Sequence, residues 1–242
     1  MKPVKNQLTD HYHLAKHIST ILKIADQSDL DRSPESLRLI GFTGNSGAGK
    51  STLIGKIANE LVSKNIKVAI LLIDPTSVDT GGTLLGDRIR LDPLLPSKGV
   101  YIRSLSTGSN QGNLPRNLNR ILAVLAENKF EFVLIETIGI GQAEAEIRSY
   151  VDTLIVLPAI DVGDSLQYYK TNVFELCDVI FVNKSDLRLE ALHSHTKRYL
   201  EEFISVKTWI SRIAPQVVFG SAKTGEGVEE LISIITRVGS ES

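Results

Sequence analysis

The stretch RLIGFTGNSGAGKSTLIGKIANELV, residues 38–62, decides the fold. It begins with an apolar run at 38–43 that is typical of a buried strand, and it continues into a segment of helical length at 51–64. Between them, Gly44–Ser51 (GNSGAGKS) fits the pattern G-x-x-x-x-G-K-[ST]. A strand, a glycine-rich turn and a helix in this order predict a loop that binds phosphate through backbone N–H groups and the helix N-terminus.

Outward from this stretch, short apolar runs alternate with segments of helical length or periodicity. Most of the runs are almost continuously hydrophobic, which is typical of strands covered on both faces. The alternation predicts an α/β fold: a doubly wound, mostly parallel sheet with helices on both faces and a ligand crevice at the carboxyl ends of the strands. The candidate strands are 38–43, 67–74, 100–105, 130–137, 152–158, 178–183 and 216–220, and the candidate helices are 51–64, 115–128, 142–150, 164–176, 189–213 and 226–238.

One more helix is predicted ahead of this domain. Apolar residues including Leu14, Ile18 and Ile21 follow a helical period over 8–25, and a polar stretch that reads as a linker comes next. We therefore expect a helical extension with its linker at 1–36 and a P-loop nucleotide-binding domain at 37–242. Packing of the extra helix against the sheet is the default, and docking of a partner is the alternative.

Composition excludes several classes of protein. Lys and Arg total 27 against 28 for Asp and Glu, so no global field attracts nucleic acid or an anionic membrane. The single cysteine, Cys177, excludes an internal disulfide and is typical of a reducing compartment. No apolar run approaches the length of a membrane span, and the first residues lack a secretory apolar region. We expect a soluble, cytoplasmic protein that binds neither nucleic acid nor membrane.

The glycine-rich loop defines the expected phosphate site. Lys50 should reach the β- and γ-phosphates, which also makes it a candidate catalytic residue, and the hydroxyl of Ser51 should bind Mg²⁺. An ordinary glycine-rich turn is the alternative reading. The candidate phosphate-binding residues are Gly44, Asn45, Ser46, Gly47, Ala48, Gly49, Lys50, Ser51 and Thr52.

Two later loops, one after the candidate strand 178–183 and one after the candidate strand 216–220, are expected at the same sheet edge as the phosphate loop. Asp186 can accept hydrogen bonds from guanine N1–H and the 2-amino group, so the set favours GTP and GDP over ATP. Asn183 would tie loops together, Lys184 would pack along the base, and the N–H of Ala222 would meet the guanine oxygen. A strand-to-helix cap is the competing reading of Asn183–Asp186. The candidate base-binding residues are Asn183, Lys184, Asp186, Ser221, Ala222 and Lys223.

The segments between these landmarks resemble one family, the MeaB/ArgK-type GTPases, to which the human MMAA protein belongs and which chaperone cobalamin-dependent acyl-CoA mutases. The resemblance is carried by LLIDPTSVDTGGTLLGDRIRL (71–91), IETIGIGQAEAEI (135–147), VDTLIVLPAIDVGDSLQYYK (151–170) and FELCDVIFVNKSDL (174–187). It implies a GTP-hydrolysing switch that gates cofactor loading or protection of such a mutase.

The resemblance also implies a set of metal ligands. Glu136 would hold Mg²⁺ through a water molecule, Gly139 would contact the γ-phosphate, and Asp74 and Asp87 would lie around the metal. A strand-end carboxylate exposed to solvent is the alternative for Glu136. A helix cap or turn is the alternative for either aspartate.

Hydrolysis is expected to be slow without a partner. Ile140 occupies the position where Ras-type enzymes carry a water-orienting Gln. The resemblance implies that a mobile loop delivers Gln167 and Lys170, and a lysine there would stabilise charge on the γ-phosphoryl group. A solvated helix face is the alternative for Lys170, and Gln142 is a rival candidate for positioning water.

Two departures from the family pattern affect these expectations. Ser46 stands where the family usually has proline, which changes loop stiffness but removes no ligand. The chain ends at Ser242, whereas full-length relatives continue into a helical dimerisation arm, so the oligomeric state is left open.

Other functions remain in view. A nickel-insertion GTPase of the hydrogenase and urease accessory type is one, although Cys177 stands alone, and the spacing of His11, His13 and His17 does not place all three on one helix face. A GTP-dependent binding module with little turnover is another. A kinase-like transfer to a small molecule is the least favoured, because no separate acceptor domain is evident.

Overall fold

A computed structural model describes residues 3–23, 34–74, 99–107, 114–115, 117–137, 146–158, 176–187, 201, 204–205 and 214–237.

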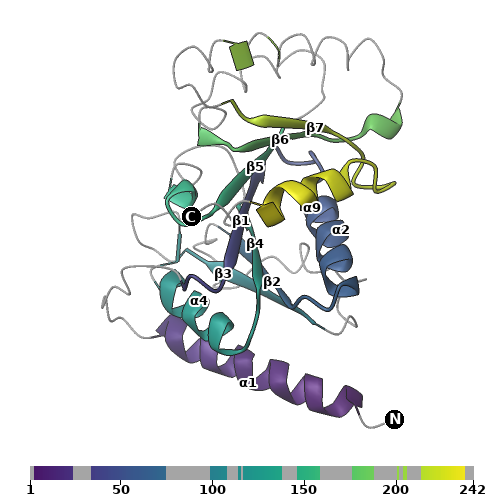
Figure 1. The fold of residues 1–242 in the computed structure, drawn as a ribbon. Helices are drawn as coiled ribbons and strands as arrows, with labels where there is room; N and C mark the ends of the chain where they lie inside the picture. The colour runs from purple at the N-terminus through teal and green to yellow at the C-terminus, as the bar shows by residue number, and fades with distance from the viewer. Residues whose placement is uncertain are drawn as a thin grey trace. The chain divides into compact units, whose positions relative to one another are not determined.

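Seven strands form one sheet in the order β3-β2-β4-β1-β5-β6-β7 (Figure 1). Strand β1 pairs with β5, β2 with β3, β5 with β6 and β6 with β7, and all four pairs are parallel. From β1 the chain first proceeds to one side, through β2 and β3, then returns to β4 beside β1 and continues on the other side through β5, β6 and β7, a reversal typical of a doubly wound sheet. All seven predicted strands and the fold class are confirmed. The strands are β1 (Arg38–Gly44), β2 (Val68–Asp74), β3 (Val100–Ser106), β4 (Phe132–Thr137), β5 (Thr153–Leu157), β6 (Val179–Val182) and β7 (Gln216–Phe219).

The burial of the strands explains why their sequences are continuously hydrophobic and do not alternate between apolar and polar residues. Every residue of β4, β5 and β6 is buried, as is every residue of β1 except its first. Side chains of one strand point alternately to the two faces of a sheet, so complete burial requires cover on both faces.

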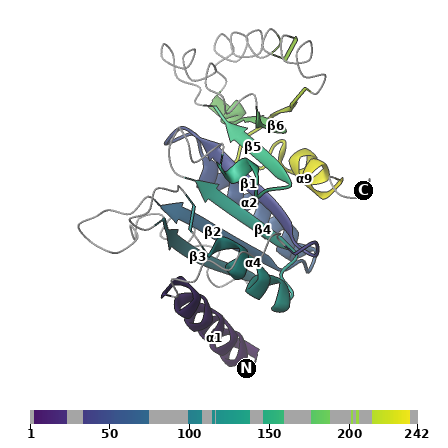
Figure 2. The ribbon, with the colours of Figure 1, turned by 90° about the vertical axis from the view of Figure 1, so that its left-hand side faces the viewer.

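The chain divides into two compact units, of which the first is Met1–Leu39 with Ala58–Ile135. Its helices α1 (Pro3–Lys23) and α4 (Leu118–Glu127) lie side by side (Figures 1 and 2). Leu14, Ile18 and Ile21 of α1 are buried, and Asn117 Nδ2 donates to the Ile21 carbonyl at 2.9 Å. Packing against the rest of its unit is therefore the observed arrangement of the N-terminal helix, which begins earlier than predicted.

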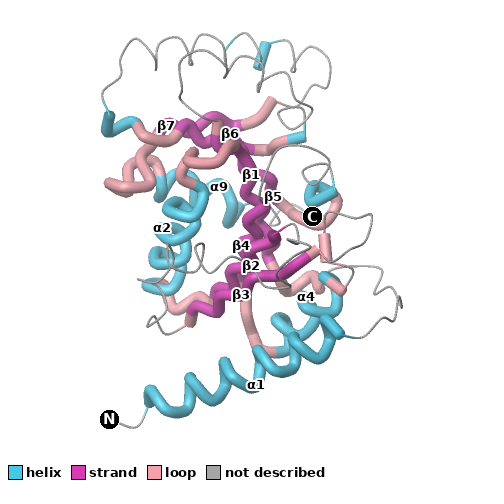
Figure 3. Tube along the Cα trace, turned by 180° about the vertical axis from the view of Figure 1, so that it is seen from behind, coloured by secondary structure: helices cyan, strands magenta, loops and turns pink. Residues whose placement is uncertain are grey.

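The second unit is Ile40–Ile57 with Glu136–Ser242. Helix α9 (Val228–Arg237), cyan in Figure 3, is the last element of the described chain. It buries Val228, Leu231, Ile232 and Ile235, which follow the i, i+3, i+4, i+7 spacing of one helix face. Helix α2 (Lys50–Ser63) starts in this unit directly after the glycine-rich loop.

The predicted helices 51–64, 115–128 and 226–238 match α2, α4 and α9 within three residues at each end. Of the predicted helix 142–150, residues 146–150 are described and 146–148 are helical, whereas the predicted helices 164–176 and 189–213 lie mostly outside the described residues. Within the described part of the chain, no helix is long and apolar enough to cross a membrane.

Candidate functional site

The glycine-rich loop closes around its own lysine. Lys50 is 7% exposed, and its Nζ donates to the carbonyl oxygens of Gly44 at 2.7 Å and Asn45 at 3.0 Å. These bonds hold the ammonium group within the loop that connects β1 to α2. A cation fixed beside a helix N-terminus is an arrangement that suits phosphate.

Position 49 must be glycine because the side chain of Asn183, from a distant part of the sequence, packs directly against it. The φ of Gly49 is +97°, and a Cβ added there would collide with Nδ2 of Asn183. Any other residue at this position would therefore meet both backbone strain and a clash. The second glycine of the motif thus permits the loop after β6 to approach the phosphate loop.

Asn183 joins two loops with one buried amide. Its Nδ2 donates to the Ala48 carbonyl at 2.7 Å, and its Oδ1 accepts from the Ala222 N–H at 2.8 Å. The residue is 4% exposed, so either bond left unmade would cost about 1–3 kcal/mol. The glycine-rich loop and the loop after β7 are therefore placed by the same side chain.

This contact changes one detail of the expected base site. The Ala222 N–H, predicted to meet the guanine oxygen, donates to Asn183 Oδ1 in this structure. A guanine oxygen would have to share or replace that bond.

Asp186 and Ser221 form the next link between the base loops. Ser221 Oγ donates to Asp186 Oδ1 at 2.7 Å and accepts from the Thr224 N–H at 3.2 Å. Among the described residues, Ser221 is the one hydrogen-bond partner of the Asp186 carboxylate. The hydroxyl therefore fixes the orientation of the carboxylate, which lies half-buried in the short helix η2 (Ser185–Leu187).

Two residues that the sequence did not single out complete this arrangement. Ser185 donates through its N–H to the Gly220 carbonyl at 3.0 Å and through Oγ to Glu226 Oε2 at 2.7 Å. Glu226 in turn accepts the Ser221 N–H at its backbone carbonyl at 3.0 Å. No sequence signal distinguishes this glutamate, because the bond depends on how the two loops meet.

A hydroxyl and a carboxylate meet at the predicted metal position. Ser51 Oγ donates to Glu136 Oε1 at 3.0 Å, and both residues are 8% exposed. Hydroxyl and carboxylate oxygens are ligands that Mg²⁺ prefers in proteins. The donors therefore fit Mg²⁺, with Ser51 as the direct ligand and Glu136 holding the ion through a water molecule.

Several predicted residues are not placed by the structure. Asp74 is the last residue of β2, but the structure describes only its backbone. Among the described residues, no group of three or more His, Cys, Asp or Glu side chains could hold a metal ion. Asp87, Gly139, Gln142, Gln167 and Lys170 lie outside the described residues, as does Ile140.

The remaining predicted residues line the edges of the loops. Thr52 is exposed on α2, and Ser46 and Lys223 are exposed in their turns. Lys184 lies at φ 68°, a left-handed backbone conformation that is uncommon outside glycine and that turns the chain between β6 and η2.

The fold and the arrangement of these loops define a P-loop domain of the GTPase type. A family model described as methylmalonyl-CoA mutase-associated GTPase MeaB matches residues 4–240. The chain belongs to this family.

Two curated relatives show the range of similarity. A putative GTPase of Pyrococcus horikoshii is 35% identical over 195 residues, which are 80% of this chain and 61% of that protein. The mitochondrial methylmalonic aciduria type A homolog of Mus musculus is 30% identical over 219 residues, 88% of this chain and 52% of that protein. The chain spans 46–61% of the length of the first three curated relatives.

Two solved structures share the fold. The LAO/AO transport system kinase has a TM-score of 0.67 at 24% identity, covering 94% of this chain and 70% of its own. HypB from Helicobacter pylori, in complex with nickel, has a TM-score of 0.60 at 18% identity, covering 98% and 96%. At these identities the likeness concerns the fold alone.

Proposed function

We propose that this chain binds GTP and GDP with Mg²⁺, hydrolyses GTP slowly, and uses the nucleotide state to gate cofactor loading or protection of a cobalamin-dependent acyl-CoA mutase in the cytoplasm. The partner follows from the family, whose model is described by association with methylmalonyl-CoA mutase. The nucleotide follows from the site.

The observation that carries the guanine assignment is the bond from Ser221 to Asp186. The Asp186 carboxylate accepts a hydrogen bond of 2.7 Å from Ser221 Oγ, and this bond fixes the direction in which its acceptor oxygens point. Guanine offers two adjacent donors, N1–H and the 2-amino group, whereas adenine has no such pair. Because a wrong base would leave the charged acceptor unpaired, the site discriminates strongly.

The substitution Asp186→Asn tests the guanine assignment, because the variant should prefer a different base, xanthine. The amide keeps one acceptor but replaces the other with a donor, so it no longer matches guanine and instead matches xanthine, whose position 2 carries an oxygen. We expect GTP affinity to fall about 100-fold or more, because one hydrogen bond is lost and the other is no longer assisted by charge, and XTP affinity to rise. Direct titration with both nucleotides measures the exchange. Equal GTP binding by both proteins would refute the guanine role of Asp186.

The catalytic roles of Lys50, Ser51 and Glu136 are supported by the contacts described above, and the roles of the other residues by the family resemblance. Lys50 would neutralise charge on the β- and γ-phosphates, and Ser51 with Glu136 would hold Mg²⁺, whose chemistry is to neutralise phosphate charge. Asp74 and Asp87 would support the metal, and Gly139 would contact the γ-phosphate. Gln167 and Lys170 would complete the site in the hydrolytic state, with Lys170 stabilising the charge that develops on the γ-phosphoryl group.

Hydrolysis in the presence of a candidate mutase tests the partner. We expect slow turnover by the chain alone and a many-fold rise on addition of a cobalamin-dependent acyl-CoA mutase, with the rise lost in Lys170→Ala. A cobalamin-independent enzyme of similar size serves as the control partner. Turnover that ignores the mutase would leave the nucleotide assignment intact and refute the client.

A further inference from the structure

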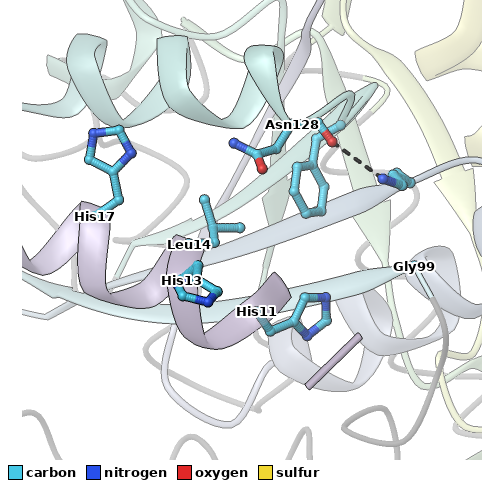
Figure 4. A pocket seen from close by; sticks show the side chains of 8 residues that line it. His11, His13, Leu14, His17, Gly99 and Asn128 are labelled. Carbon is cyan, nitrogen blue, oxygen red and sulfur yellow. Dashed lines mark hydrogen bonds between the residues drawn. The ribbon is translucent and has the colours of Figure 1, made fainter. Parts of the chain in front are cut away.

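A pocket of about 300 Å³ lies in the first compact unit, at the ends where strands β2 and β3 begin (Figure 4). Its walls are α1, the turn after α4, and the residues Lys67 and Gly99 that precede the two strands. The residues assigned above to nucleotide binding belong to other loops, at the carboxyl ends of strands. This pocket therefore takes no part in the proposed function.

The described side chains that line the pocket include basic residues but no acidic ones. The basic residues are His11, His13, His17 and Lys67. The whole chain has a formal charge of −1, so the pocket is a local concentration of basic groups and not part of a generally basic surface. An imidazole ring offers at least one N–H donor in either protonation state, and a lysine offers three.

Lys67 contacts a carbonyl group and an aromatic ring. Its Nζ donates to the Asn128 carbonyl at 3.3 Å and lies 5.9 Å from the centre of the Phe130 ring. Among the described residues these are its side-chain partners, and neither is a carboxylate. A positioned ammonium group beside an aromatic ring is suited to receive an anion.

The three histidines are arranged along the wall and not gathered at a point. Figure 4 shows His11, His13 and His17 spaced along α1, with Leu14 between them and Asn128 on the opposite wall. All three line the same pocket, although their spacing was not expected to place them on one helix face. The apolar surface of Leu14 and Phe130 leaves room for a carbon skeleton.

We propose that this pocket binds a small organic anion that carries at least two carboxylate or phosphate groups. Two anionic groups on one skeleton can pair with the lysine and with a histidine of the lining at the same time, whereas an anion with one such group cannot. A metal ion is the less fitting occupant, because no set of three or more metal-ligating side chains occurs in the described part of the chain.

Histidine ring resonances provide a readout local to the pocket. The chain has five histidines, of which His11, His13 and His17 line the pocket. Citrate, pyrophosphate and acetate are titrated separately at fixed pH and ionic strength. Pyrophosphate bound only to the glycine-rich loop would leave the pocket rings unmoved, which separates the two sites.

We expect citrate or pyrophosphate to shift the three pocket rings with saturation, and acetate to bind at least about tenfold more weakly. The relative affinities of citrate and pyrophosphate show whether carboxylate or phosphate is the preferred group. Lys67→Met should weaken binding about three- to tenfold, as expected for an exposed charged contact. Lys64→Met, an exposed lysine outside the pocket, is the matched control and should leave the affinity unchanged.

A second variant, His13→Gln with His17→Gln, should weaken binding through a different wall of the pocket. The proposal is overturned if no dianion shifts the pocket rings with saturation, or if Lys64→Met weakens binding as much as Lys67→Met. It is also overturned if Zn²⁺ or Ni²⁺ saturates the rings at one equivalent while the anions leave them unchanged.

Discussion

Single residues connect the loops of the nucleotide site, and Asn183 shows how. One amide satisfies an acceptor in the glycine-rich loop and a donor in the loop after β7. Gly49 leaves the space that this amide occupies. A change at either position would therefore disturb phosphate and base recognition together, although the two residues are far apart in sequence.

Glu226 is predicted to support nucleotide affinity without touching the nucleotide. Its bond to Ser185 Oγ at 2.7 Å holds the loop that carries Asp186. We expect Glu226→Ala to weaken GTP binding about three- to tenfold, the cost of one hydrogen bond. Titration of GTP measures the effect, with Glu229→Ala on the exposed side of α9 as the control.

A double-mutant cycle separates this bond from unrelated effects. Ser185→Ala and Glu226→Ala should each weaken binding, and the double variant should be no weaker than either single variant, because both remove the same bond. Fully additive losses would show that the two residues act independently.

Among the elements, α1 is the one whose role the sequence left open. Besides its buried apolar residues, Ser19 Oγ accepts from Arg103 at 2.8 Å, so the helix is bonded to β3 as well as packed beside α4. Strand β3 ends the seven-strand order, and an edge strand without cover is prone to pair with other chains. The contacts with α1 help to protect this edge.

Truncating the buried face of α1 is predicted to lower the stability of the protein. Ile18 is fully buried, and Ile18→Ala should reduce the free energy of unfolding by about 2–5 kcal/mol. Lys16→Ala, on the exposed face, should change it by about 0.5 kcal/mol or less. Urea unfolding followed by circular dichroism compares the two. If both variants match the parent protein, the helix is not packed in solution.

At the scale of the whole molecule, the loops assigned to the nucleotide all belong to one compact unit, and the histidine-lined pocket belongs to the other. The second unit assembles its site from two segments, Ile40–Ile57 and Glu136–Ser242, that are separated in sequence by residues 58–135 of the first unit. A ligand that bridges these segments is expected to stabilise the folded state, since the unfolded chain cannot hold them together.

GDP with Mg²⁺ is therefore predicted to raise the thermal midpoint. At 100 times its dissociation constant, a ligand adds about 2.7 kcal/mol, which corresponds to about 5–11 °C for a chain of this size. ADP with Mg²⁺ should leave the midpoint unchanged. Glu136→Gln should lose the part of the shift that depends on Mg²⁺, whereas Glu60→Gln, exposed on α2, should keep it. An equal shift with ADP would contradict guanine selection.

The sequence by itself determined the seven strands, the fold class and the glycine-rich loop. These features are local: apolar runs long enough for buried strands, and a spacing of glycine, lysine and serine that needs no distant partner. Helix positions were predicted where periodicity was strong, with errors at the ends such as the start of α1 at Pro3.

Only the tertiary structure decided the order of the strands, the packing of α1 beside α4, and the contacts of Asn183, Ser185 and Glu226. Each depends on chain segments separated by dozens of residues, and no pattern within a segment encodes which segment will meet it. The bond between Ser51 and Glu136 spans 85 positions in sequence. Such contacts exist because the carboxyl ends of parallel strands meet at one sheet edge, where the loops that follow them are brought within hydrogen-bond distance.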